Sequence, residues 1–313
     1  MTHPRKFRFG VTALSAASGA EIREKARTIE DLGYSTLFMA DHFADTVLAP
    51  MVAISFAAAA TTTLRVGHLV LGNDYKHPVV TAKEAATVDV LSDGRVELGL
   101  GAGWMTADYD QLGIPYDSAG TRIARLAEAV DIVKRSFAAE PFDYAGEHYR
   151  ITGYTGKPTP VQQPRPPLVM GGGGPKMLRL AGREADIVGI NPNLRAGEVG
   201  ADALTNATAD LTAQKVEWVR EGAGDRFDDL EVQIRYYVAA ITDDARGFAE
   251  MMAPGFGVSA DDVVGMGIVL VGTVDEVCDL LVRRREQWGV SYIVVGGDAF
   301  EAFAPVVARL AGT

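Results

Sequence analysis

The sequence predicts an α/β protein of the (β/α)8 (TIM) barrel class with an inserted segment. Short apolar runs alternate with longer amphipathic runs along nearly the whole chain. Eight of the short runs begin near residues 7, 36, 65, 96, 168, 186, 231 and 292, and nearly all precede a helical pattern. These runs are continuously apolar, as expected where both faces of a parallel sheet are buried. A doubly wound sheet is the alternative, because periodicity alone does not separate the two folds.

The first half of the chain supplies four strand–helix pairs. We expect strands over 7–11, 36–39, 64–71 and 96–100, and helices over 20–32, 51–60, 79–91 and 122–137. The last helix has the clearest pattern, with apolar residues at three- and four-residue spacing from Ile123 to Phe137. Residues 140–166 break the rhythm, and their richness in Pro, Gly and Tyr predicts an irregular insertion.

The second half resumes the alternation. We expect strands over 168–170, 186–190, 231–240 and 292–295, and helices over 176–181, 207–220, 274–288 and 300–310. A helical excursion is expected at about 244–265, followed by a short apolar run at 268–271. Since no low-complexity tract or charge block divides the chain, we expect one barrel domain over 1–313.

Composition excludes several classes of protein. The chain has 313 residues, 48% of them hydrophobic, so it can bury a large core without disulfides or metals. A formal net charge of −11 argues against a nucleic-acid partner. The single cysteine, Cys278, excludes an intramolecular disulfide and indicates a reducing compartment. No histidine cluster has metal-ligand spacing, so no metal site is expected. With no apolar segment long enough for a leader or a membrane span, we expect a cytoplasmic protein.

Polar side chains follow the second and third predicted strands. Asp41 and His42 come directly after the second strand, where a barrel presents its catalytic groups. A pair that only hydrogen-bonds the backbone is the alternative interpretation. Leu71, Gly72 and Asn73 follow the third strand, and an ordinary turn explains these three residues equally well.

A glycine-rich segment follows the fourth strand. Gly101, Ala102 and Gly103 would let a flat ring or a pyrophosphate approach the backbone, and Trp104 could stack on it. The segment lacks the βαβ context and the acidic residue of the dinucleotide fingerprint. It therefore indicates a ring-binding surface only weakly.

The fifth strand ends in a second glycine-rich segment. Met170 is followed by Gly171, Gly172, Gly173 and Gly174, and then by Pro175 and Lys176 at the start of a helix. Successive backbone N–H groups, the positive end of the helix and the lysine together favour a phosphate site. A flexible connector is the alternative. Asn191, after the sixth strand, is placed to hydrogen-bond a ligand or to form a turn.

These residues carry a resemblance to a known family. The matching stretches are Asp41-His42-Phe43, residues 77–80 and 83–89, residues 91–95, 99–104 and 171–186, and residues 271–276. In order and extent they resemble the luciferase-like monooxygenase superfamily, in particular its coenzyme F420 (deazaflavin)-dependent oxidoreductases.

The resemblance implies a bacterial luciferase-like barrel with a flavin-like cofactor in its mouth. His42 would lie near the deazaflavin ring, and Asp41 would orient it. Residues 69–72 correspond to the family's bulged third strand, which often contains a non-prolyl cis peptide. Gly101, Ala102 and Gly103 would line the ring pocket, while Gly171–Gly174 and Lys176 would hold the cofactor phosphate. A homodimer is also implied.

The chain departs from one branch of the superfamily. Sugar-phosphate dehydrogenases carry a general-acid Glu where this chain has Trp104, and a Trp where it has Thr46. The resemblance therefore disfavours glucose 6-phosphate as substrate, and no replacement acid is identifiable.

The sequence thus predicts a coenzyme F420-dependent oxidoreductase that transfers a hydride between the deazaflavin and a small organic substrate. One alternative is a flavin mononucleotide (FMN)-dependent monooxygenase that oxygenates a small organic substrate. A non-catalytic flavin-binding barrel is the alternative of another class. A separate F420 or flavin reductase is a possible partner of either enzyme.

Overall fold

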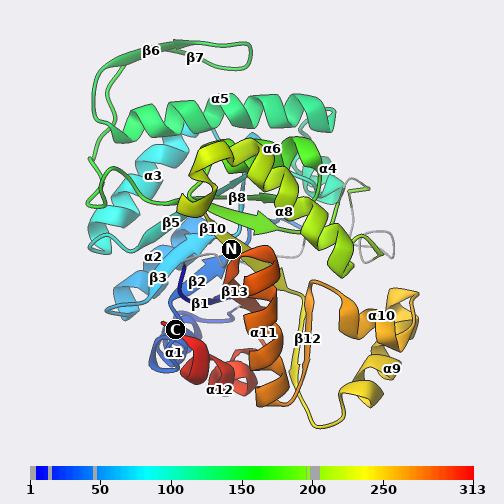
Figure 1. Cartoon of the computed structure of the whole chain (residues 1–313). Coiled ribbons are helices and arrows are strands. Elements are labelled where there is room, and N and C mark those ends of the chain that lie inside the picture. Colours follow the sequence, from blue (N-terminus) through cyan, green and yellow to red (C-terminus); the bar gives the residue numbers. More distant parts are fainter. Residues whose placement is uncertain (1–4, 13–15, 45–47, 195, 198–204) are drawn as a thin grey trace. The chain divides into compact units, whose positions relative to one another are not determined.

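The structure is a computed structural model and describes residues 5–12, 16–44, 48–194, 196–197 and 205–313 (Figure 1). Its contacts divide the chain into two compact units. Unit 1 comprises residues 1–13, 28–36 and 171–313, and unit 2 comprises residues 14–27 and 37–170.

The main sheet has the strand topology of the predicted barrel. Its hydrogen-bonded order is β3-β2-β1-β13-β10-β9-β8-β5-β4, and β3 also pairs with β5, so the order closes on itself. The eight barrel strands are β1 (Arg8–Thr12), β2 (Thr36–Met39), β3 (Arg65–His68), β5 (Val96–Gly101), β8 (Leu168–Gly172), β9 (Ile187–Ile190), β10 (Glu231–Tyr236) and β13 (Val290–Gly296). Each of the eight predicted strands has a counterpart among them. The doubly wound alternative is wrong, because a closed order leaves no open edges.

Unit 2 carries the helices that follow the first strands. They are α2 (Pro50–Ala60), α3 (Pro78–Leu91), α4 (Thr106–Leu112) and α5 (Ala119–Phe137), with α1 (Gly19–Asp31) shared between the units. Proline in the first turn starts α2 and α3, because the missing N–H would have no partner there. Ser118 caps α5 by accepting a hydrogen bond from the Thr121 N–H. Helix α4 was not predicted; its seven residues are too few to show a helical period.

The insertion at 140–166 is more regular than predicted. It contains an antiparallel hairpin of β6 (Phe142–Ala145) and β7 (Arg150–Tyr154), which lies beside α5 in Figure 1. The Glu128 carboxylate on α5 holds the hairpin turn by accepting hydrogen bonds from the N–H groups of Glu147 (2.8 Å), His148 (3.1 Å) and Tyr149 (3.2 Å). The turn is therefore fixed by a side chain outside the insertion, which local patterning does not reveal.

Unit 1 contains the helices of the second half. They are α6 (Pro175–Glu184), α8 (Ala209–Ala223), α11 (Val274–Trp288) and α12 (Phe300–Leu310). The predicted helical excursion is confirmed as α9 (Ala245–Phe256) and α10 (Ala260–Gly265). The strand expected over 231–240 is instead two strands, because β11 (Val238–Ile241) leaves the main sheet and pairs with β12 (Val269–Gly272). Cys278 is buried in α11, as expected.

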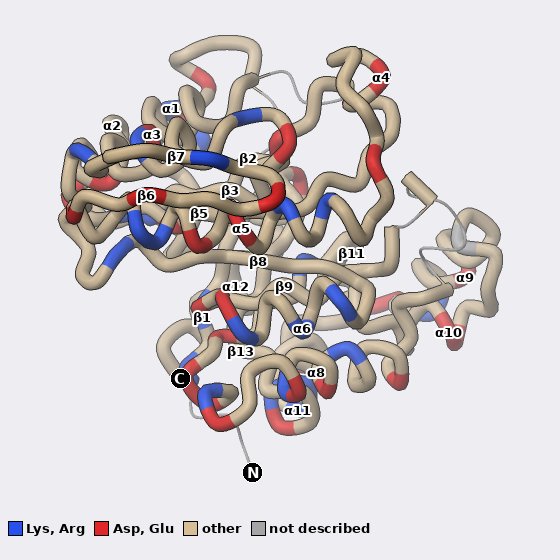
Figure 2. The backbone as a smooth tube through the Cα atoms, turned by 90° about the horizontal axis from the view of Figure 1, so that it is seen from above, with Lys and Arg blue, Asp and Glu red and all other residues tan. Residues whose placement is uncertain are grey.

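Charged residues of both signs are interspersed along the elements of each unit, as Figure 2 shows. Within the described parts of the chain, no helix has the length and apolar character needed to cross a membrane. The same residues contain no group of three His, Cys, Asp or Glu side chains arranged to hold a metal ion.

Candidate functional site

His42 is paired with a carboxylate that the sequence did not reveal. The His42 Nδ1 atom lies 2.7 Å from Oδ2 of Asp108, which projects from α4 and is fully buried. The same Oδ2 accepts a hydrogen bond from the Tyr75 hydroxyl at 3.1 Å. Oδ1 accepts the N–H groups of Phe43 (2.7 Å) and Ala44 (3.0 Å). Burial alone would raise the pKa of the Asp108 carboxyl, but hydrogen bonds from His42, Phe43 and Ala44 hold it below its ordinary value.

Asp41 has a different partner from the one expected. Its Oδ2 atom accepts the Gly72 N–H at 3.1 Å, so it ties the end of β2 to the end of β4 (Leu71–Gly72). Burial raises the pKa of the Asp41 carboxyl, and the Gly72 N–H only partly offsets this effect. The expectation that Asp41 orients His42 is therefore wrong, because the hydrogen bond to the ring comes from Asp108.

Residues 69–73 pass close beside this network. The Leu69–Val70 peptide is cis, as the family resemblance implied for this segment. Leu71 and Gly72 pair in parallel with Leu100 and Gly101 of β5. A β-carbon at residue 72 would lie 2.3 Å from the Tyr75 ring, so a glycine is needed for this ring to reach Asp108. Asn73 donates a hydrogen bond from Nδ2 to the Tyr149 hydroxyl at 3.1 Å.

The segment after β5 contacts His42 through the side chain of Trp104. Gly101 is the last residue of β5 and is buried. Gly103 has a φ of +75°, which favours glycine, and the Ala102 carbonyl accepts a hydrogen bond from Nε of Arg122 at 3.2 Å. The Trp104 ring meets the His42 ring edge-on, with centroids 5.3 Å apart. An indole, and not a carboxylate, is therefore the next side chain to His42 on this side. Thr46, the other departure from the sugar-phosphate branch, lies outside the described residues.

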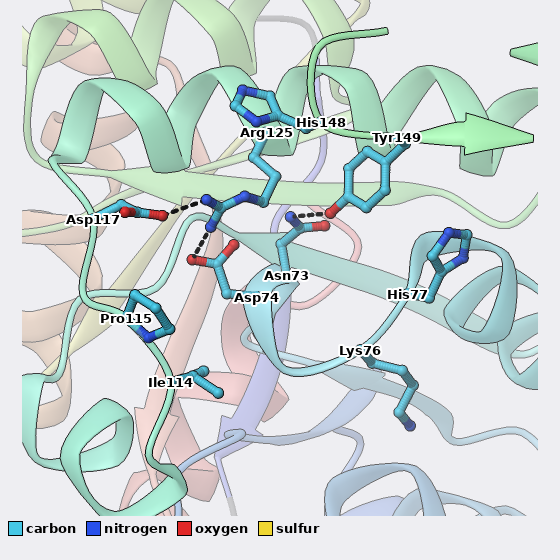
Figure 3. Close-up of a pocket in the computed structure, with 10 residues that line it drawn as sticks. All are labelled: Asn73, Asp74, Lys76, His77, Ile114, Pro115, Asp117, Arg125, His148 and Tyr149. Carbon is cyan, nitrogen blue, oxygen red and sulfur yellow. Dashed lines mark hydrogen bonds and ion pairs between the residues drawn. The ribbon is translucent and has the colours of Figure 1, made fainter. Parts of the chain in front are cut away.

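Unit 2 also contains an open pocket of about 430 Å³, shown in Figure 3. Its lining residues are Asn73, Asp74, Lys76, His77, Ile114, Pro115, Asp117, Arg125, His148 and Tyr149. Arg125 lies between Asp74 (2.9 Å) and Asp117 and makes an ion pair with each. Lys76 pairs with Glu84 at 2.6 Å. Since both cations are already paired, the pocket offers little unpaired charge to an anionic ligand, and we assign it none.

The second glycine-rich segment belongs largely to unit 1. Met170 is buried in β8, Gly171 and Gly172 end that strand, and Gly174 precedes α6 with no side-chain cap. A β-carbon at residue 173 would lie 2.2 Å from the Pro192 carbonyl oxygen, and one at residue 171 would lie 3.1 Å from Nδ2 of Asn191. These glycines are therefore required by the close approach of residues 189–193.

No side chain caps the first turn of α6, where the helix dipole is positive. Lys176, the second residue of α6, is exposed there. The Asn191 N–H donates a hydrogen bond to the Gly172 carbonyl at 3.0 Å, which keeps the neighbouring strand end in place. The predicted site residues thus fall into two groups. The group in unit 1 contains Gly171–Gly174, Lys176 and Asn191, and the group in unit 2 contains Asp41, His42, Leu71–Asn73 and Gly101–Trp104.

The chain is similar in sequence to proteins of one known family. The sequence pattern of the luciferase-like monooxygenases matches residues 6–246. An F420-dependent glucose-6-phosphate dehydrogenase of Nakamurella multipartita is 31% identical over 257 residues, which are 79% of this chain and 72% of that enzyme. An FMNH2-dependent dimethylsulfone monooxygenase of Pseudomonas putida is 30% identical over 165 residues, which are 50% of this chain and 45% of that enzyme.

Solved structures agree on the fold. The coenzyme F420-dependent tetrahydromethanopterin reductase from Methanopyrus kandleri superposes with a TM-score of 0.80 at 20% identity, covering 98% of this chain and all of that one. At this identity the similarity shows the fold alone. The relatives and structural neighbours thus include both F420-dependent oxidoreductases and FMN-dependent monooxygenases.

Proposed function

The chain belongs to the luciferase-like monooxygenase family, and on this basis we propose that it transfers a hydride between coenzyme F420 and a small organic substrate. The observation that carries the proposal is the fixed position of His42, whose Nδ1 bonds buried Asp108 while its ring meets Trp104. A histidine held in one orientation beside a ring-binding surface is suited to move a proton as a substrate gains or loses a hydride.

The residues present fit a deazaflavin cofactor. The N-terminal end of α6, which no side chain caps, and Lys176 beside it suit a phosphate. Gly101, Ala102 and Gly103 lie at the end of β5 and just after it, next to Trp104, and we assign the cofactor ring to this segment. When bound, the deazaflavin supplies or accepts the hydride as a two-electron carrier.

The two carboxylates near His42 are suited to different roles. The pKa of Asp108 is lowered, so this side chain is an anion that bonds the imidazole. Burial raises the pKa of Asp41, whose Oδ2 accepts the Gly72 N–H. We assign the proton held at His42 to the reaction, and Asp41 to the support of the Gly72 backbone.

The substrate class follows from Trp104. A sugar phosphate needs polar groups around its ring, while this position presents an indole against His42. We therefore propose a small substrate with an apolar body and one reducible or oxidisable group, and not glucose 6-phosphate. The related dehydrogenase from Nakamurella multipartita would then share the cofactor but not the substrate.

A cofactor titration tests the proposal. Purified protein is titrated with coenzyme F420 and, separately, with FMN, and binding is followed by fluorescence. We expect tight binding of the deazaflavin and weak binding of FMN. Preference for FMN would favour the second candidate, an FMN-dependent monooxygenase like the Pseudomonas putida relative. If neither ligand binds, the assignment of the glycine-rich segments is wrong.

A non-catalytic flavin-binding protein is the alternative of another class. The His42–Asp108 pair argues against it, because a binding protein needs no oriented proton carrier. Turnover with any hydride donor or acceptor would exclude a purely binding role.

We also propose that the protein is a cytoplasmic homodimer that works with a separate reductase. Helices α2 and α3 carry apolar side chains that are exposed in the single chain, namely Val52, Phe56, Val80, Val90 and Leu91. The free cysteine is compatible with a reducing compartment. Sedimentation of the wild-type protein and of Leu91→Glu tests the dimer.

A further inference from the structure

We propose that Asp108 on α4 is a positioning residue that holds neutral His42 in its Nδ1–H tautomer. This inference deepens the proposed function and rests on it for its catalytic meaning. It concerns a residue outside every sequence motif singled out above, 66 positions from the histidine it contacts.

The hydrogen bonds of Asp108 leave one consistent assignment of protons. The Oδ1 atom accepts two backbone N–H groups, from Phe43 and Ala44, and Oδ2 accepts the Tyr75 hydroxyl. An ionised carboxylate has only acceptor sites, so the remaining contact, 2.7 Å from Oδ2 to His42 Nδ1, requires a proton on the nitrogen. Nδ1 is therefore a donor, and in the neutral ring Nε2 is a bare acceptor.

The position of Asp108 is itself fixed. The side chain is fully buried on α4, and a change in its position would remove the acceptor that the N–H groups of Phe43 and Ala44 now share. The Tyr75 ring, which fills the space above Gly72, closes the Oδ2 side. Asp108 therefore joins the segment after β2 to α4 and sets the ring orientation at the same time.

The chemical consequence is a defined Nε2 atom. With Nδ1 committed to Asp108, Nε2 accepts a proton from a substrate group that loses hydride, or returns one to a group that gains it. The buried carboxylate stabilises the imidazolium that forms in between, as an Asp partner does in other His-based sites.

The substitution Asp108→Asn gives a sharp test, because the amide can fit in only one way. Phe43 and Ala44 both donate, so the amide oxygen takes the Oδ1 position and the amide NH2 faces His42. Nδ1 must then become the acceptor, and the tautomer changes to Nε2–H. Asp108→Glu keeps an acceptor and restores Nδ1–H. Asp110→Asn, an exposed residue on the same helix, is the matched control.

The measurement is the ¹⁵N NMR spectrum of histidine-labelled full-length protein without cofactor, at a pH where the imidazole is neutral. The chain has five histidines, and His42→Gln identifies the signals of His42 by their loss. We expect Nδ1–H in the wild type, in Asp108→Glu and in Asp110→Asn, and Nε2–H in Asp108→Asn. A wild-type ring in the Nε2–H form, or an unchanged tautomer in Asp108→Asn, overturns the inference.

The test is independent of the proposed function. If the tautomers behave as expected but the protein does not bind F420, the positioning role of Asp108 stands and the cofactor assignment fails. If F420 binds but the wild-type ring is Nε2–H, the reverse holds.

Discussion

The hydroxyl group of Tyr109 occupies the position that a β-carbon of residue 103 would need. A β-carbon built at Gly103 lies 1.9 Å from this hydroxyl oxygen, and the backbone there has a φ of +75°. Tyr109 is fully buried and donates a hydrogen bond to Asp74 at 3.0 Å, so it has little freedom to move. The backbone conformation and the packing thus both require glycine beside Trp104.

We therefore expect Gly103→Ala to destabilise the protein by roughly 3 kcal/mol, from positive-φ strain and a steric clash together. Gly113→Ala is the matched control, since Gly113 has a φ of +66° and no atom within 4 Å of the added carbon. It should cost only about 1 kcal/mol. Urea unfolding of both variants measures the difference. Equal losses would show that the Tyr109 contact contributes nothing.

The sequence predicts the barrel better than it predicts the site. The eight strands are continuous apolar runs, so the local sequence is enough to predict that they are buried. Each was predicted within a few residues of its observed bounds. Closure of the sheet depends on the pairing of β3 with β5, which no periodicity encodes. His42 was found because it follows a predicted strand.

Asp108 was missed because it lies in α4, a seven-residue helix too short to show a helical period. Asp41 was expected to orient His42 because the family resemblance implied this role for the residue next to it in the sequence. The sequence does show an acidic residue four positions after the Gly103-Trp104 pair. Its role could not be predicted, because it contacts a histidine 66 positions away in the sequence.

The role of His42 predicts a separation of turnover from binding. His42→Ala removes the group that moves the proton but touches none of the glycine-rich backbone, so turnover should fall roughly 10²–10⁴-fold while F420 affinity stays nearly unchanged. Steady-state kinetics and a fluorescence titration measure the two quantities. His77→Asn is the control, because His77 is exposed and its capping role on α3 can be kept by Asn. Undiminished turnover in His42→Ala would refute the catalytic assignment.

Lys176 predicts the opposite pattern. If it contacts the cofactor phosphate, Lys176→Gln should weaken F420 binding by about 1–2 kcal/mol, roughly 5- to 30-fold, with little change in turnover at saturation. The loss should shrink at high ionic strength, because salt screens an exposed charge.

Arg179→Gln serves as the comparison, since Arg179 lies one turn further along α6 and pairs with Glu221 at 2.6 Å. Similar weakening in both variants would indicate a general charge effect and no specific phosphate contact.

His68 predicts a dependence of stability on pH that has nothing to do with catalysis. It is fully buried at the end of β3, and within the described structure neither ring nitrogen has a hydrogen-bond partner. Burial, with a smaller contribution from Lys76, lowers the pKa of His68 to about 3. The unfolded chain binds this proton below about pH 6.5, whereas the folded protein does not until about pH 3.

Stability should therefore fall as the pH is lowered from about 6.5 towards 3, by about 2 kcal/mol between pH 7 and pH 5 from this residue alone. His68→Leu removes the titrating group at similar volume, so its unfolding free energy should lose that part of the slope. His77→Leu, at an exposed position, should keep it. Denaturant unfolding at pH 7, 6 and 5 measures the three slopes. A wild-type slope retained in His68→Leu would mean that His68 is protonated in the folded protein or that other groups dominate this pH range.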